Sequence, residues 1–157
     1  SKRIVETMFN TVSDKQIGVW GFAFKKDTND TRESAAISIC RDLLRERSRL
    51  KIYDPQVSER QIRQDLAAQF CGSDGSITDA GQALLDQNLE VVNSCAAAAE
   101  QSHAITVLTE WDEFQSVNLD RVFASMQRPA FLFDGRNVIN RDAAVASGFE
   151  FHGIGKP

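Results

Sequence analysis

The chain has 157 residues, of which 42% are hydrophobic and 25% are charged, so it is long enough to bury the core of one ordinary domain. Its 18 basic and 22 acidic side chains give a net charge of −4, which disfavours a general surface for nucleic acids or anionic membranes. Three cysteines without a C-x-x-C pair, together with two histidines, argue against a metal site and favour a reducing, cytoplasmic compartment.

The first segment, residues 3–11, has apolar residues at the spacing of an amphipathic helix. The chain starts at Ser1, which is not an initiator methionine, and it enters this helix at once. We therefore expect residues 1–13 to be the tail of a helix from a longer protein. Residues 14–157 then form the domain itself.

A mostly apolar run at residues 16–20, continued by apolar positions as far as Phe24, predicts a central strand buried on both faces. A helix is expected from Glu33, with Asp30 as its N-cap and Glu33 returning the bond as in a capping box. Residues 50–53 predict a second strand. Strand, helix and strand then form one βαβ unit, whose crossover is parallel and right-handed.

The remaining chain continues to alternate between helices and strands, and no apolar run approaches the roughly 20 residues of a membrane span. Helices are expected over residues 56–70, 79–86, 96–101, 119–126 and 141–146, and strands over residues 89–92, 104–108, 130–133 and 149–154. This alternation predicts a single α/β domain: a three-layer α/β/α, Rossmann-like fold with a mainly parallel, doubly wound sheet of five to six strands.

Two loops at the carboxyl ends of the predicted strands carry cations, at residues 24–32 and 134–137. Open parallel sheets bind ligands at this edge, near the point where the strand order reverses. Lys25 offers a compact positive charge to a phosphate, and Arg136 offers a planar fork, so together they could neutralise a diphosphate. The alternative is that these lysines are solvated and pair with the two nearby aspartates of the same loop.

Two other features of a dinucleotide site are missing or ambiguous. The fingerprint G-x-G-x-x-G is absent, because Gly18 and Gly21 are three residues apart and lie within or at the end of the strand. Asp54 follows the second strand, where such folds place a ribose-binding acid, but an Asp-Pro pair after a strand is more typical of a turn. Cradling of a dinucleotide by this chain in the usual manner is therefore not expected.

Nucleophilic catalysis is not expected either. Cys95 lies at a predicted helix N-terminus and Cys71 precedes a glycine, but neither has a histidine base nearby in the sequence. Cys40 falls on the buried face of its helix, and His103 heads a buried strand, where it is interpreted as structural. No catalytic residue is predicted on this chain.

Five motifs, in the same order along the chain, resemble the UDP-binding, C-terminal domain of the UDP-glucose 6-dehydrogenase family. The first, Gly-Phe-Ala-Phe-Lys-Lys-Asp-Thr-Asn-Asp-Thr-Arg-Glu-Ser at residues 21–34, is the most specific. The others are Ile-Tyr-Asp-Pro at 52–55, Thr-Glu-Trp at 109–111, Phe-Asp-Gly-Arg at 133–136 and Gly-Ile-Gly-Lys at 153–156. The resemblance spans nearly the whole chain and is weakest at residues 56–100.

The resemblance implies that Phe24, Lys25 and Arg136 bind the UDP-sugar, and that Arg32 reaches NAD bound by an adjacent subunit. It also implies an oxidoreductase that oxidises UDP-glucose twice with NAD to give UDP-glucuronate. Residues 1–13 would then be the tail of the central, inter-domain helix. The expected partners are the N-terminal NAD-binding domain of the same enzyme and further copies of the enzyme in a dimer or hexamer.

The family's glycine fingerprint, its catalytic cysteine and the lysine and asparagine that assist it are not in this chain, so the chain alone is expected to be inactive. The related dehydrogenases that act on UDP-N-acetylmannosamine or GDP-mannose remain alternatives. A stand-alone nucleotide-binding or regulatory module with the same fold is a further alternative.

Overall fold

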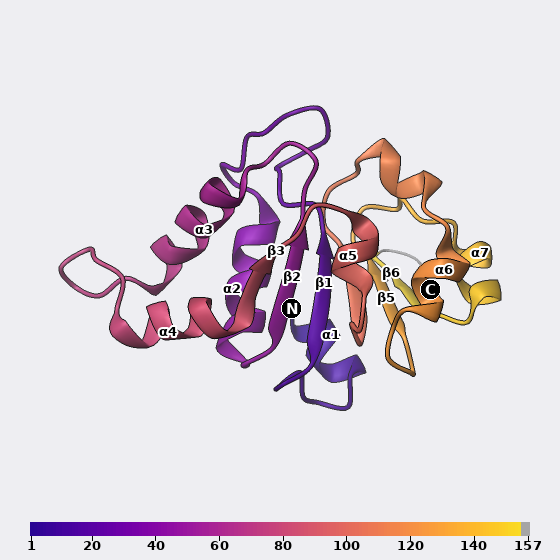
Figure 1. Cartoon of the computed structure of the whole chain (residues 1–157), viewed down its shortest axis with the longest axis horizontal. Helices are drawn as coiled ribbons and strands as arrows, with labels where there is room; N and C mark the ends of the chain where they lie inside the picture. The colour runs from indigo at the N-terminus through magenta and orange to yellow at the C-terminus, as the bar shows by residue number, and fades with distance from the viewer. Residues whose placement is uncertain (155–157) are drawn as a thin grey trace.

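The computed structural model describes residues 1–154, and it contains one six-stranded sheet in which every neighbouring pair of strands is parallel (Figure 1). The strand order is β3-β2-β1-β4-β5-β6. The strands are β1 (Gln16–Trp20), β2 (Arg49–Tyr53), β3 (Leu89–Val91), β4 (Ala104–Val107), β5 (Phe131–Asp134) and β6 (Glu150–Gly153). This arrangement confirms the predicted three-layer, doubly wound α/β fold.

Three adjacent inner strands, β1, β4 and β5, are the most buried. Every residue of β4 and β5 is buried, as are four of the five residues of β1, as expected of parallel strands covered on both faces. From β1 the chain winds outward through β2 to β3, then crosses back to β4 on the other side of β1. The strand order therefore reverses between β1 and β4, and ligands of such sheets bind outside the carboxyl ends of these strands.

The helices cover the sheet and also match the predicted segments closely. They are α1 (Lys2–Thr7), α2 (Ala35–Arg45), α3 (Glu59–Ala67), α4 (Asp79–Asn88), α5 (Cys95–Ala99), α6 (Leu119–Ala124) and α7 (Arg141–Ser147), with short 3₁₀ helices η1 (Ala68–Phe70) and η2 (Asp112–Ser116). Helix α5 lies across β1 (Figure 1), where a Cβ on Gly18 would come 2.5 Å from the Ala98 carbonyl oxygen. None of the helices within residues 1–154 is long and apolar enough to cross a membrane.

The predicted start of α2 was wrong. The helix begins at Ala35, and its N-cap is Ser34, whose hydroxyl accepts the Ala36 N–H at 3.2 Å. Glu33 has a φ of 60°, so it cannot be part of the first helical turn. Ser34 takes the capping position because its hydroxyl also donates to the Phe22 carbonyl oxygen at 2.8 Å, which ties the helix start to the end of β1.

Strand β1 has the predicted bounds and ends at Trp20 because Gly21, with a φ of 97°, turns the chain, although Phe22 and Ala23 remain fully buried. The first predicted helix, at residues 3–11, is shorter in the structure. Helix α1 ends at Thr7, and the buried Ile4 joins it to the core.

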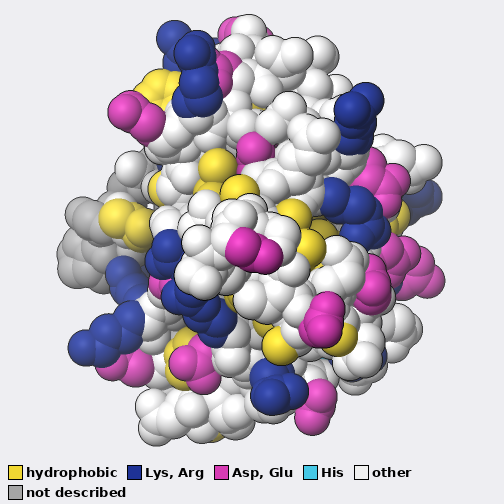
Figure 2. Space-filling view, turned by 90° about the vertical axis from the view of Figure 1, so that its left-hand side faces the viewer, with side chains coloured by type: hydrophobic (Ala, Val, Ile, Leu, Met, Phe, Trp, Pro, Cys, Tyr) yellow, Lys and Arg dark blue, Asp and Glu magenta, His cyan; other side chains and the backbone are white. Residues whose placement is uncertain are grey.

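Figure 2 shows the face of the molecule on the side of α3 and α4, where basic and acidic side chains are interspersed among small apolar groups. Part of this mixing comes from pairs within one helix, such as Arg63 and Glu59 on α3, whose side chains lie 2.9 Å apart. This side of the molecule is therefore not a basic face.

Candidate functional site

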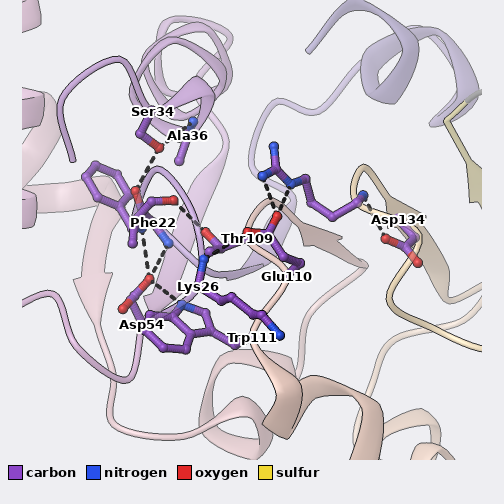
Figure 3. Close-up of polar contacts among 11 residues, drawn as sticks. Phe22, Lys26, Ser34, Ala36, Asp54, Thr109, Glu110, Trp111 and Asp134 are labelled. Atoms are coloured by element: carbon purple, nitrogen blue, oxygen red, sulfur yellow. Dashed lines mark hydrogen bonds and ion pairs between the residues drawn. The ribbon is translucent and has the colours of Figure 1, made fainter. Parts of the chain in front are cut away.

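The loop after β1 is anchored by the carboxylate of Asp54, which follows β2 and is 8% exposed. Three donors from two other segments converge on Asp54 Oδ2 (Figure 3): Phe22 N–H at 2.7 Å, Ala23 N–H at 2.9 Å and the Trp111 indole N–H at 3.1 Å. Oδ1 accepts the backbone N–H groups of Gln56 and Val57 at 2.8 and 3.0 Å. The predicted turn at Asp54-Pro55 is confirmed, and its aspartate also fixes the beginning of the Lys25 loop.

The loops after β1 and β4 touch directly at the point where the strand order reverses. The Thr109 hydroxyl donates to the Ala23 carbonyl oxygen at 2.8 Å. A Cβ on Gly21 would lie 2.7 Å from the Thr109 backbone nitrogen, and Gly21 has a φ of 97°. Glycine is required there for both its small size and its positive φ, because any side chain would push the two loops apart.

Glu110, the next residue, contacts two loops at once (Figure 3). Its Oε1 accepts the Lys26 backbone N–H at 2.8 Å, and its Oε2 accepts Arg136 Nε–H at 2.6 Å and forms an ion pair with Arg136 Nη2. Burial raises the pKa of Glu110, but the Lys26 N–H and the Arg136 guanidinium outweigh this, so the pKa of Glu110 lies below its usual range. The loops after β1, β4 and β5 thus meet at one ionised carboxylate.

Asp134, the last residue of β5, shapes the loop that carries Arg136. Its Oδ1 accepts the Arg136 backbone N–H at 2.9 Å, while its Oδ2 accepts those of Val138 at 2.8 Å and Ile139 at 2.7 Å. The aspartate is 1% exposed, so a buried carboxylate determines where the Arg136 side chain leaves the backbone.

The predicted ligand residues lie around this junction. Phe24 is 44% exposed, and its backbone N–H donates to the Asp30 carbonyl oxygen at 2.8 Å. Lys25 is exposed, and among the contacts of residues 1–154 none uses its ammonium. Lys26 is held at both ends, because its N–H donates to Glu110 and its ammonium lies 3.1 Å from Asp112 Oδ1. Residues 24–26 and Arg136 are thereby gathered at the same edge of the sheet.

Arg32 pairs with Asp30 in the same loop. Its Nη2 lies 2.8 Å from Asp30 Oδ2 and its Nε lies 3.0 Å from Oδ1, while the Arg32 side chain stays 88% exposed. These hydrogen bonds lower the pKa of Asp30 to about 2. The helix begins three residues later at Ala35, so Arg32 lies in the loop that precedes α2.

The cysteines and His103 do not form a reactive centre. Burial raises the pKa of the Cys40 and Cys95 thiols to about 12, so both are protonated at neutral pH. His103 Nδ1 accepts the Gln16 backbone N–H at 3.1 Å, which confirms its structural role. Within residues 1–154, no cluster of three or more histidine, cysteine or acidic side chains could hold a metal ion.

Three carboxylates organise the site: the sequence interpretation missed Glu110 and Asp134, and it treated Asp54 as a turn residue only. A signal for them was present, because each comes at or just after the end of a predicted buried strand, where an acid can accept several loop N–H groups. What the sequence could not show is which donors each acid would take.

A parallel, doubly wound sheet with cations gathered at its switch point defines a Rossmann-like nucleotide-binding domain. Residues 18–141 match the model of the UDP-glucose/GDP-mannose dehydrogenase family, UDP binding domain. The chain belongs to this family. The motif predicted at residues 153–156 extends beyond the described residues, and the other four motifs lie within residues 1–154.

Similar proteins cover the chain almost completely. UDP-glucose 6-dehydrogenase 3 from Arabidopsis thaliana is 47% identical over 99% of the chain, and UDP-glucose 6-dehydrogenase 1 from Glycine max is 45% identical over 99%. The chain spans about a third of the length of these relatives. A solved UDP-D-ManNAc dehydrogenase from Pyrococcus horikoshii is 27% identical with a TM-score of 0.65, covering 98% of this chain and 28% of that one.

Proposed function

We propose that the chain is the UDP-sugar-binding domain of a UDP-glucose 6-dehydrogenase, an NAD-dependent oxidoreductase that converts UDP-glucose to UDP-glucuronate. The identity of 45–47% to relatives named UDP-glucose 6-dehydrogenase supports this choice over the UDP-N-acetylmannosamine and GDP-mannose enzymes. The single observation that carries the ligand assignment is the convergence of the Lys25 loop and Arg136 on Glu110 at the switch point.

In this proposal the diphosphate of the UDP-sugar lies between the Lys25 ammonium and the Arg136 guanidinium. Lys25 supplies a mobile point charge, and Arg136 supplies a planar donor group whose backbone is fixed by Asp134. Phe24, 44% exposed beside Lys25, offers an apolar surface to the sugar or the base.

NAD supplies the hydride acceptor, and this chain does not fit it as the main binding site. The β1–α2 connection runs from Gly21 to Ser34 with Gly21 as its one glycine, so it does not form a tight glycine turn that offers its backbone to a pyrophosphate, and Ser34 already caps the Ala36 N–H. The remaining two thirds of the relatives' length leaves room for an N-terminal NAD-binding domain with the catalytic groups. Residues 1–13 would join it to the domain at 14–157.

Arg32 is the one residue assigned to NAD. Its guanidinium is 88% exposed and pairs with Asp30, so it stands on the surface where a neighbouring subunit could bring its cofactor. This assignment requires a homo-oligomer, such as a dimer or hexamer. A cytoplasmic location is part of this proposal, and three cysteines without a disulfide support it, because they suit a reducing compartment.

The experiment is calorimetry with UDP, UDP-glucose and GDP-mannose on the wild type, Lys25→Ala and Arg136→Ala. We expect weak binding of the uridine ligands that weakens further with salt, because only one wall of the pocket is present. Each substitution should weaken UDP binding at least tenfold, since a charge-assisted hydrogen bond contributes on the order of 1.5–3 kcal/mol. Lys2→Ala is the matched control, because Lys2 is an 89% exposed lysine on α1.

An unchanged, measurable UDP affinity in both variants would overturn the site assignment. Tighter binding of GDP-mannose than of UDP-glucose would favour the sibling enzyme. The gene provides a separate test: a reading frame that encodes a glycine fingerprint and a cysteine upstream of Ser1 is expected, and a complete frame that starts near Ser1 would favour a stand-alone module.

A further inference from the structure

We infer that Glu110 is a positioning residue, which holds Arg136 and the Lys25 loop in the one arrangement that accepts a diphosphate. The inference rests on the proposed function and assigns a role to a residue that itself carries the wrong charge for an anion site. Glu110 is the one side chain among residues 1–154 that contacts both the backbone of the loop after β1 and the guanidinium of Arg136.

The contact with Arg136 fixes the direction of the guanidinium. A single oxygen, Glu110 Oε2, accepts from Nε at 2.6 Å and also pairs with Nη2, so it sets the direction in which the Nε–Nη2 edge of the guanidinium points. None of the contacts recorded for residues 1–154 uses Nη1, so this nitrogen is left to donate to a ligand. Because the Arg136 side chain is 36% exposed, that donor is accessible from solvent.

Glu110 can hold Arg136 only if its own position is fixed, and both neighbours fix it. The Thr109 side chain is fully buried and donates to the Ala23 carbonyl oxygen at 2.8 Å. The Trp111 indole is 7% exposed and donates to Asp54 at 3.1 Å. Between these two anchors the Glu110 backbone cannot shift without breaking buried hydrogen bonds, so its side chain leaves the backbone from a fixed point.

The positioning role and simple charge repulsion predict opposite changes in UDP affinity when the charge of Glu110 is removed. A carboxylate beside a diphosphate repels it, so if Glu110 had no positioning role, removing its charge would tighten UDP binding. If Glu110 positions Arg136, the same substitution must weaken binding. Glu110→Gln is suited to this test, because one side-chain oxygen cannot satisfy both the Lys26 N–H and Arg136, and the new amide N–H would face one of these donors.

Asp112 is the matched control. It also follows β4, it carries the same charge, and it pairs with the Lys26 ammonium at 3.1 Å while 73% of its side chain stays exposed. None of its recorded contacts within residues 1–154 involves Arg136. Asp112→Asn therefore removes a negative charge near the same loop without disturbing the guanidinium.

The test combines UDP calorimetry with ¹⁵N NMR of the Arg136 Nε–Hε group on the 157-residue chain. In Glu110→Gln we expect UDP affinity to fall about tenfold, since members of one hydrogen-bond network couple by on the order of 1.4 kcal/mol. We also expect the protected Arg136 Nε–Hε signal to move and exchange with water. Asp112→Asn should leave that signal in place and leave affinity unchanged or slightly higher.

The outcomes distinguish the positioning role of Glu110 from the proposed UDP-binding function. If Arg136→Ala loses UDP binding while Glu110→Gln binds UDP equally or more tightly, the positioning role alone is overturned. An Arg136 Nε–Hε signal that is unaffected by Glu110→Gln does the same. A wild type that binds no UDP while the signal responds as expected overturns the proposed function and the ligand role with it. If Glu110→Gln fails to fold, Glu110→Asp replaces it, because it keeps the charge but is too short to span both loops, and unchanged affinity there refutes the inference.

Discussion

Replacing Asp54 by asparagine changes a single oxygen, yet it should destabilise both the fold and the ligand loop. The aspartate is 8% exposed and accepts five hydrogen bonds, three at Oδ2 and two at Oδ1. An amide has one acceptor oxygen, which should face the three donors near Oδ2 because that orientation keeps more bonds. Its NH₂ group then faces the Gln56 and Val57 N–H groups, so both donors lose their acceptor, and the one on Val57 is buried.

The magnitude follows from those two donors. Each hydrogen bond to the charged carboxylate that is lost costs on the order of 1–2 kcal/mol, so Asp54→Asn should lower the free energy of unfolding by about 2–4 kcal/mol. For a domain whose total stability is on the order of 5–15 kcal/mol this is a large fraction. With an m-value on the order of 2 kcal/mol/M, the urea midpoint should fall by about 1–2 M.

The assay is urea unfolding followed by the fluorescence of the two tryptophans. Asp86→Asn is the control, because Asp86 is exposed on α4 and accepts a single bond from the Gln82 side chain at 2.8 Å; it should shift stability by less than about 0.5 kcal/mol. If Asp54→Asn also changes stability by less than this, the five-bond account of Asp54 is refuted.

Three further results are expected. Under native conditions a thiol reagent should modify only Cys71, because the Cys40 and Cys95 thiols are buried and their pKa values are raised to about 12. After unfolding, all three thiols should react. Rapid reaction of two or more thiols in the native protein would contradict this. In an NMR titration Asp30 should have a pKa of about 2, since hydrogen bonds from Arg32 favour its ionised form, and Arg32→Ala should raise it toward 3.8. The pair is stabilising above pH 3.8 and loses its effect as pH falls through about 2, so an unchanged Asp30 midpoint in the variant would rule the pair out. Gly21→Ala should cost about 2–4 kcal/mol in urea unfolding, because its Cβ meets the Thr109 backbone at 2.7 Å and its φ is positive; a cost below 1 kcal/mol would show that the two loops are not in contact.

The sheet could be predicted from the sequence because strands buried on both faces need runs of apolar residues, and such runs are visible in the sequence. The apolar runs at residues 104–108 and 130–133 became β4 and β5, each within one residue of the expected bounds. An apolar pattern does not by itself indicate a strand at Phe22 and Ala23, which are buried but lie in the loop after β1. Their backbone groups are satisfied by the Asp54 carboxylate and not by a neighbouring strand, and an apolar pattern cannot distinguish these two solutions.

The helix start shows a second limit. Asp30 and Ser34 are both good N-cap residues, and local preference alone favoured Asp30 because of the acid three residues later. The choice was made by a tertiary bond from the Ser34 hydroxyl to the Phe22 carbonyl oxygen, at 2.8 Å. Asp30 was then free to pair with Arg32, so one distant contact changed the role of both residues.

The candidate site shows the same limit of local sequence patterns, because its cations could be identified from the sequence but the carboxylates that pair with them could not. Arg136, Lys26 and Arg32 each pair with a carboxylate, from Glu110, Asp112 and Asp30 respectively. A ligand that enters this edge therefore meets little excess positive charge, and long-range attraction cannot be the main source of its affinity. Affinity must come from the placement of a few donors, and in the described residues the buried acids Asp54 and Asp134 set that placement for the two loops. This is why the most informative substitutions at an anion site are of acids: they change where the cations point while leaving the cations themselves in place.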